Sequence, residues 1–404
     1  MNDQVQKCWD VALAMLKPTQ AQLEHGLELH RASVVCDTYG FAPNAALDGD
    51  ALAKAMEEGA SDAEIADMRE DMGMTRWATV PQEREEFKAA FDFAGVTCIY
   101  QNAGEEGQDP LRLIKRLARF TYSTDLMRDF VARAATPDDI LAAHKEGRHC
   151  LYFTGNGVPL TQHWVSPEEE MRYIRIFFQL GIRMMHLTYN RRNMIGDGCA
   201  EPANGGLSDF GRKVIAEMNR QGVLVDCAHS GWQTSLEAAQ TSTKPMVASH
   251  SACAALQHHH RGKPDNVIRA IADTGGYIGI CAVPAFLGGR GTIVDFIDHI
   301  DYVKRNYGAD YVGIGTDTSY VPARQSEEWK KLPSRGPQRK RWCNFWWEND
   351  PLHDPKWQKE EQHQSLGWTN WPLFTVGMVQ RGYSDEDIQK IIGGNMLRVA
   401  RAVL

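Results

Sequence analysis

The chain has 404 residues, of which 43% are hydrophobic and 24% charged, and its formal net charge is −8 at pH 7. A negative charge disfavours nucleic acid and anionic membrane surfaces as partners, and no stretch is apolar for long enough to cross a bilayer. The N-terminal residues lack the continuous apolar run of a secretory signal, and scattered cysteines without a CxxC pair indicate reduced thiols. We therefore expect a cytoplasmic protein with a small-molecule substrate and neither nucleic acid nor a membrane as partner.

Eight short runs rich in Val, Ile, Tyr and Cys recur along the chain, separated by longer segments of helical periodicity. They cover residues 32–37, 96–102, 149–155, 183–190, 223–230, 246–251, 276–282 and 311–317. Nearly continuous apolar strands that alternate with helices are typical of a parallel sheet covered on both faces, and eight of them indicate a closed barrel. The predicted fold class is α/β, a (β/α)8 TIM barrel forming a single domain over residues 1–404.

Two connections are much longer than a barrel loop requires. About residues 42–90 follow the first strand and include an acidic helical stretch, and about residues 323–365 follow the eighth strand and are dense in Trp, Lys and Pro. Insertions after barrel strands often build lids and substrate pockets. For the Trp-rich insertion a satellite hydrophobic core is an equally good interpretation. Residues 384–404 predict a closing helix capped by Ser384.

Polar side chains stand at the ends of several predicted strands. His229 ends the fifth strand, His250 the sixth and Asp317 the eighth. The carboxyl ends of barrel strands converge on one face, so we expect these three side chains in one site. Two neutral imidazoles and a carboxylate can bind a divalent metal and place a base near its water. The sequence thus predicts His229 and His250 as metal ligands and Asp317 as a catalytic residue, although each alone would more often be structural.

Two further residues suit a substrate site on the same face. Arg261 lies eleven residues after His250, where its guanidinium suits a substrate carboxylate. A surface arginine is the competing interpretation, because its neighbours are polar. Tyr189 ends the fourth strand and is a candidate for catalysis or substrate binding. The three adjacent histidines at 258–260 point apart and predict a solvated loop rather than a metal cluster.

Several segments together resemble the membrane (renal) dipeptidase family, peptidase M19, of the amidohydrolase superfamily. They are the LTYN stretch, VLVDCAHS, MVASHS, the arginine of HHHRGKPDN, YVGIGTD and the closing GGNMLRV. The likeness is strong over about residues 145–320 and 365–404, and it is weaker before residue 145. The resemblance implies an amidohydrolase-like barrel with a zinc pair that hydrolyses dipeptides and related small amides, usually as a homodimer. It also implies that His229 and His250 hold one metal ion, that Arg261 binds the substrate carboxylate and that Asp317 handles the proton.

The chain departs from the family pattern at the remaining positions. Tyr39 and Phe41 stand where the family has a His-x-Asp pair, Gly155 or Asn156 where it has a bridging glutamate, and Tyr189 where it has a pocket histidine. Phenylalanine cannot ligate zinc, and a neutral tyrosine is a poor ligand. We therefore expect one Zn²⁺ ion, or another divalent metal, in place of a pair. His229 and His250 hold it, and Asp317, water or another group such as Cys36, Asp37, Asn156 or Tyr39 completes the site. Tyr39, Asn156 and Tyr189 are expected as substrate contacts. A metal-free pocket stays open as an alternative.

Three functions fit these features. The predicted one is a metal-dependent hydrolase of a dipeptide or dipeptide-like small amide that carries a free carboxylate. The alternative is a lyase or decarboxylase on a small carboxylated substrate in the same barrel mouth, with His229 or His250 as acid or base and Tyr189 as proton donor. The third is a binding protein whose chemistry has decayed, and the intact His229, His250 and Asp317 speak against it.

Overall fold

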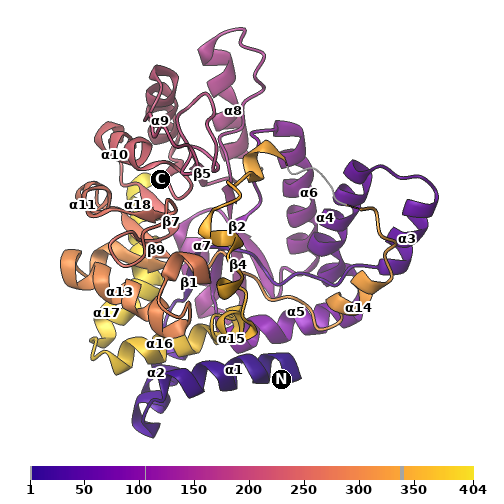
Figure 1. Cartoon of the computed structure of the whole chain (residues 1–404), viewed down its shortest axis with the longest axis vertical. Helices are drawn as coiled ribbons and strands as arrows, with labels where there is room; N and C mark the ends of the chain where they lie inside the picture. The colour runs from indigo at the N-terminus through magenta and orange to yellow at the C-terminus, as the bar shows by residue number, and fades with distance from the viewer. Residues whose placement is uncertain (1, 105, 337–340) are drawn as a thin grey trace.

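Eight parallel strands form the centre of the structure, a computed structural model that describes residues 2–104, 106–336 and 341–404 (Figure 1). All eight predicted strands are present, each at its expected place in the chain, which confirms the α/β barrel. In spatial order they are β1 (Cys36–Gly40), β2 (Cys98–Asn102), β4 (His149–Gly155), β5 (Met184–His186), β6 (Leu224–Asp226), β7 (Val247–Cys253), β9 (Tyr277–Ile280) and β10 (Val312–Ile314).

The barrel is nearly closed, and the chain meets itself where the first and last strands end. The backbone N–H of Asp317 donates to the carbonyl oxygen of Tyr39 at 3.0 Å, and that of Phe41 donates to Thr318 at 3.3 Å. Two short strands lie outside the barrel path and were not predicted. They are β3 (Val131–Ala134), which pairs with β4, and β8 (Gly262–Lys263), which pairs with β7.

Helices surround the barrel and fill the insertions (Figure 1). The α-helices are α1 (Asp3–Leu16), α2 (Gln20–Ala32), α3 (Gly49–Glu57), α4 (Asp62–Thr79), α5 (Pro81–Ala94), α6 (Pro110–Leu126), α7 (Pro137–Lys145), α8 (Pro167–Gln179), α9 (Asp209–Gln221), α10 (Trp232–Thr241), α11 (Asp265–Asp273), α12 (Pro284–Leu287), α13 (Ile293–Tyr307), α14 (Gln325–Lys330), α15 (Glu360–Ser365), α16 (Trp371–Gln380), α17 (Asp385–Gln389) and α18 (Asn395–Val403). Short 3-10 turns are η1 (Ala309–Tyr311), η2 (Trp342–Asn344), η3 (Pro351–His353), η4 (Pro355–Trp357) and η5 (Trp368–Asn370), and η6 (Lys390–Gly394) is π-helical.

Local sequence sets where several helices begin. Thr136 caps α7 through a reciprocal pair of hydrogen bonds with Asp139, and a proline occupies the first turn, where a missing N–H costs nothing. Ser384 caps α17 as predicted, because its hydroxyl accepts from the N–H of Asp387 at 3.2 Å. The single closing helix predicted for residues 384–404 is instead α17 and α18 with η6 between them.

The strands are buried on both sides, as their continuous apolar sequences require. On β2 and β4, Ile99, Leu151 and Phe153 pack in the core between strands and helices. Tyr100 and Tyr152 belong to the other core cluster, and their rings stack with centroids 4.4 Å apart. Since side chains alternate across a strand, this second cluster fills the barrel interior.

The two insertions meet at one side of the barrel. Figure 1 shows α3 and α4 of the first insertion beside α14 of the second. The backbone N–H of Gly49 donates to the carboxylate of Glu328 at 2.9 Å, and Lys331 lies 2.7 Å from Asp50. The described parts of the loops after β1 and β10 therefore contact each other.

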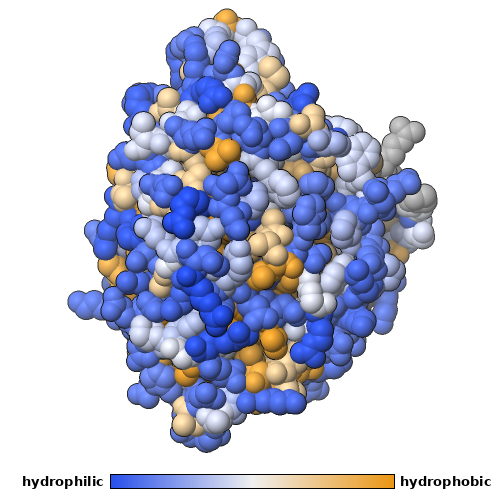
Figure 2. Space-filling model, turned by 60° about the vertical axis from the view of Figure 1, so that its left-hand side comes forward, coloured by the Kyte–Doolittle hydropathy of each residue, from blue (hydrophilic) through white to orange (hydrophobic). Residues whose placement is uncertain are grey.

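On the face drawn in Figure 2, hydrophobic residues are scattered among hydrophilic ones. None of the helices in the described ranges combines the length and the apolar character that a membrane span requires.

Candidate active site

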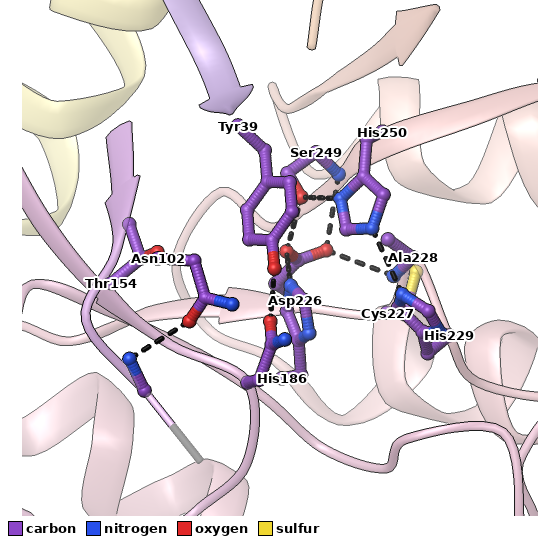
Figure 3. A network of polar contacts seen from close by, with 12 residues as sticks. Tyr39, Asn102, Thr154, His186, Asp226, Cys227, Ala228, His229, Ser249 and His250 are labelled. Atoms are coloured by element: carbon purple, nitrogen blue, oxygen red, sulfur yellow. Dashed lines mark hydrogen bonds and ion pairs between the residues drawn. The ribbon is translucent and has the colours of Figure 1, made fainter. Parts of the chain in front are cut away.

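The carboxyl ends of the barrel strands bring aromatic and acidic side chains together (Figure 3). Tyr39 lies on β1, His186 ends β5, Asp226 ends β6 and His250 lies on β7. His229 follows shortly after the end of β6. Because the strands are parallel, residues far apart in sequence share this one face.

His229 and His250 face each other, with their Nε2 atoms 2.9 Å apart. The Nδ1 of His229 lies 2.7 Å from Oδ1 of Asn190, which accepts its proton. The Nδ1 of His250 lies 2.8 Å from the hydroxyl of Ser249, whose own proton goes to Asp226. Each ring therefore donates from Nδ1 and directs an Nε2 lone pair at the other ring. Two facing lone pairs at this distance repel each other, and a cation shared between them removes the repulsion.

Burial keeps both imidazoles neutral. His250 is fully buried and His229 is 6% exposed. The pKa of both rings lies well below the usual value for histidine, mainly because of burial and next because of the nearby Arg261. The neutral imidazole is the form that ligates a metal, so the donor chemistry of this pair fits a divalent ion.

His186 and Asp226 form a buried pair beside these histidines, and the sequence analysis missed it. The Nε2 of His186 lies 2.6 Å from Oδ2 of Asp226. The other carboxylate oxygen accepts from the backbone N–H groups of Ala228 at 2.9 Å and Ser249 at 3.0 Å. Ligand atoms of His186, Asp226 and His250 lie within 4.8 Å of one another, so this group also has the composition and spacing of a metal site. His186 and Asp226 end their strands, but the sequence analysis selected the later residues Tyr189 and His229 as the functional ones.

Two tyrosine rings pack on the histidine pair. Tyr39 stacks on His250 with centroids 3.8 Å apart and planes 13° apart, and Tyr189 stacks on His229 at 4.1 Å. The hydroxyl of Tyr39 donates to Oδ1 of Asn156. Burial raises the pKa of Tyr39 well above its usual value, so the phenol stays neutral. The structure thus brings the predicted substrate contacts Tyr39 and Tyr189 next to the predicted metal ligands, and Asn156 next to Tyr39.

Arg261 lies against the strand ends that carry the histidines. It is 1% exposed, and its guanidinium donates to the carbonyl oxygen of Ala228 and, at 3.0 Å, to that of His250. These bonds use two of the five N–H groups of a guanidinium. A contact between Arg261 and a substrate carboxylate, as predicted, would have to use the others.

Lys263 is a second buried cation that the sequence analysis did not single out. Its Nζ donates to the carbonyl oxygens of Cys227 at 2.7 Å and Ser230 at 2.8 Å, and to the hydroxyl of Ser235 at 3.1 Å. Burial lowers the pKa of Lys263 from its usual value. His229 lies in the chain between the two carbonyl groups, so Lys263 fixes the loop that carries it.

The histidine loop before Arg261 is only partly solvated. His258 and His260 are exposed, as predicted, but His259 is buried, which contradicts the expectation for that residue. Its Nδ1 accepts from the backbone N–H of Arg261 at 3.0 Å, and its Nε2 lies 3.3 Å from Asp350 of the Trp-rich insertion. The insertion packs on this loop and thereby buries the ring.

Asp317 follows β10 in a left-handed backbone conformation, with φ 57°. Such a conformation is uncommon for a residue other than glycine and is found at functional sites. Burial raises the pKa of its carboxyl group to about 6, while the nearby Arg261 and His186 side chains act in the opposite direction. The pKa of Asp317 therefore depends on residues of the same histidine cluster.

A pocket of about 650 Å³ opens beside Tyr189, and we call it the outer pocket. Tyr189 borders both the outer pocket and His229, and the carboxylate of Glu106 accepts from Asn156 Nδ2 at 3.4 Å. One wall comes from the Trp-rich insertion of the same chain. The lining residues are Glu106, Gly107, Gln108, Gln162, Tyr189, Arg191, Arg192, Asn193, Met194, Arg341 and Trp342.

Comparison with known proteins gives relatives along most of the chain. Residues 24–334 match the family model "Membrane dipeptidase (Peptidase family M19)". Dipeptidase tcpJ of Claviceps purpurea (strain 20.1) is 26% identical over 284 residues, which are 69% of this chain and 57% of that protein. Dipeptidase aclJ of Aspergillus oryzae is 28% identical over 232 residues, 56% of this chain and 46% of that protein. The chain thus spans about half the length of the curated relatives it matches.

Solved structures share the fold over nearly the whole chain. An amidohydrolase from Pseudomonas aeruginosa has a TM-score of 0.66 and 25% identity, covering 94% of this chain and 98% of that one. A metallo peptidase from Rhodobacter sphaeroides, liganded with a phosphinate mimic of the dipeptide L-Ala-D-Ala, has a TM-score of 0.63 and 15% identity, covering 92% and 100%. The second likeness shows the fold alone. Since the family model matches well over half of the sequence, the chain belongs to the membrane dipeptidase family, peptidase family M19.

Proposed function

We propose that the protein is a metal-dependent hydrolase of a dipeptide or dipeptide-like small amide that carries a free carboxylate. The observation that carries this proposal is the pair of Nε2 atoms of His229 and His250, 2.9 Å apart and both anchored through Nδ1. Membership of the family and the dipeptidase names of the curated relatives support it.

The metal in this proposal is one zinc ion held by His229 and His250. When bound, it supplies Lewis-acid activation of a water molecule and of the amide carbonyl. Tyr39 and Asn156 are hydrogen-bonded to each other, which suits a substrate contact better than metal ligation. Ser249 positions His250, because its hydroxyl connects that ring to the buried carboxylate.

The remaining residues divide the work on the substrate. Asp317, with a pKa of about 6, is a carboxylate at neutral pH and accepts the proton that the attacking water loses. Tyr189 lies between His229 and the outer pocket, where it orients the substrate or donates a proton. Arg261 binds the substrate carboxylate through the N–H groups that do not donate to the carbonyl oxygens of Ala228 and His250. The expected homodimer and cytoplasmic location stay predictions.

The test is hydrolysis of a dipeptide panel by protein freed of metal with a chelator and then reloaded with Zn²⁺. We expect activity only after reloading, and none from reloaded His229→Ala or His250→Ala protein. Turnover that survives exhaustive chelation, with carbon dioxide or an alkene among the products, would instead support the lyase or decarboxylase. Failure to cleave any dipeptide, N-acyl amino acid or small amide would contradict the hydrolase.

A further inference from the structure

The outer pocket has an apolar wall that the proposed chemistry does not use. Trp342 lines the pocket and is 60% exposed, and Met194, on another loop of the same pocket, is 48% exposed. Large apolar side chains left open to water at a concave site favour a ligand that covers them. The volume, about 650 Å³, lies within the usual range for small-molecule sites, roughly 300–1,000 Å³.

Trp342 is held in place although it is exposed. The guanidinium of Arg191 lies 4.3 Å from its ring centroid, and the ring of Phe345 stacks on it at 5.6 Å and 15°. Arg191 is also 5.2 Å from the ring of Trp347, whose indole N–H donates to Ala200 at 3.3 Å. A fixed aromatic surface loses little conformational entropy when a ligand packs on it.

The charged groups of the outer pocket already have partners of opposite sign. Arg191 lies 3.2 Å from Glu201, Arg192 lies 3.0 Å from Asp197, and Arg341 lies 3.9 Å from Glu106. A further substrate carboxylate in this pocket would have to compete with these side chains. The pocket therefore selects for apolar contact more than for an extra acidic group.

The outer pocket borders the proposed reaction centre through one shared residue, Tyr189. Tyr189 lines the pocket and stacks on His229. Its ring therefore separates a substrate at the histidine pair from the outer pocket. A side chain attached near the scissile amide would have to pass Tyr189 to enter the pocket.

We propose that the outer pocket is a specificity site for a large apolar, preferentially aromatic, side chain of the substrate, with Trp342 and Met194 as its contact residues. This inference rests on the proposed function, because it takes the substrate to be a dipeptide-like amide. In this inference the Trp-rich insertion selects the side chain of the substrate and takes no part in bond cleavage.

The experiment compares pairs of phosphinate dipeptide mimics that differ only in one side chain, methyl or benzyl, made with that side chain on either side of the phosphinate. Affinities for zinc-loaded protein are measured by calorimetry. We expect the benzyl compound of at least one pair to bind about 10- to 100-fold more tightly than its methyl partner. Trp342→Ala and Met194→Ala should each reduce this preference severalfold and leave the methyl compounds unchanged.

Trp329→Ala is the matched control. Trp329 is a partly exposed tryptophan of the same insertion, 39% exposed, that also carries an arginine, Arg69, over its ring but does not line the outer pocket. This variant should keep the full preference, and Trp342→Phe should keep most of it. Equal binding within each pair, a preference that survives Trp342→Ala, or no binding by any of the compounds would overturn the inference. Hydrolysis of Ala-Ala is measured separately, so that loss of the proposed function is distinguished from loss of selectivity.

Discussion

The Nζ atom of Lys263 lies 2.8 Å from the carbonyl oxygen of Ser230, the residue that follows His229. A second bond, to the carbonyl of Cys227, holds the other side of the same loop. A buried ammonium group with these partners exchanges its hydration for fixed acceptors. The position of His229 therefore depends on a cation from a neighbouring short strand.

Lys263→Met should lower the free energy of unfolding by about 3 kcal/mol. Methionine keeps most of the length of the side chain but loses all three hydrogen bonds of the ammonium group, at roughly 1 kcal/mol each. The two carbonyl groups keep weaker support, from the N–H of Ser230 and the hydroxyl of Ser235. Chemical denaturation measures the change. Lys213→Met, at a position where the side chain is 59% exposed, is the control and should stay within about 0.5 kcal/mol of the parent. An unchanged stability for Lys263→Met would show that the three hydrogen bonds contribute nothing.

Ser249→Ala should weaken zinc binding by about 10- to 100-fold, as expected when the partner of a ligating histidine is lost. The hydroxyl of Ser249 accepts from Nδ1 of His250 and fixes the proton on that nitrogen. Competition with a chromophoric chelator measures the affinity. Ser242→Ala, which removes a hydroxyl bonded to the carbonyl of Lys244, should not change it. Equal affinities for all three proteins would mean that Ser249 does not position His250 for metal binding.

The pH dependence of kcat/KM should report Asp317. Its pKa is raised to about 6, so the carboxylate is protonated below that pH and is free to accept a proton above it. We expect activity to rise with pH through about 6 and to level off above it. Asp317→Asn should lower kcat by roughly 100-fold or more and remove this acidic limb.

Asp273→Asn, a change at an exposed carboxylate, is the control for Asp317 and should leave the profile as it is. If the Asp317 variant kept the same acidic limb, another group would have to titrate there.

Arg261→Met should separate substrate binding from loop positioning. If the guanidinium binds the substrate carboxylate, KM should rise at least tenfold for dipeptides with a free carboxylate and change little for the same dipeptides with an amidated end. Steady-state kinetics on both series measure this difference. An equal loss on both series would assign Arg261 to holding the carbonyl groups of Ala228 and His250 alone.

The barrel could be predicted because its strands are buried on both faces and so have continuous apolar sequences. β3 and β8 escaped prediction because they are short and have no continuous apolar sequence. β3 is four residues long with an exposed residue inside it, and β8 is two residues long. Their pairing depends on neighbours that a local pattern does not contain.

The sequence identified the strand ends that form the site, but not every residue at those ends that takes part in it. His229 and His250 were correctly expected to lie together, and the structure places their Nε2 atoms in contact. His186 and Asp226 stand earlier in their segments, and only the three-dimensional register shows that their side chains reach the same cluster. The burial of His259 depends on Asp350, which lies far along the chain and could not be inferred from local polarity.

The outer pocket takes its walls from distant parts of the chain, with Glu106 on one side and Trp342 on the other, whereas the histidine pair belongs to the strands of the barrel. A cut or an exchange within the insertion would thus alter which compounds are accepted and spare the framework beneath. Sequence changes confined to this peripheral insertion could therefore change the substrate preference of such an enzyme without altering the residues that perform the reaction.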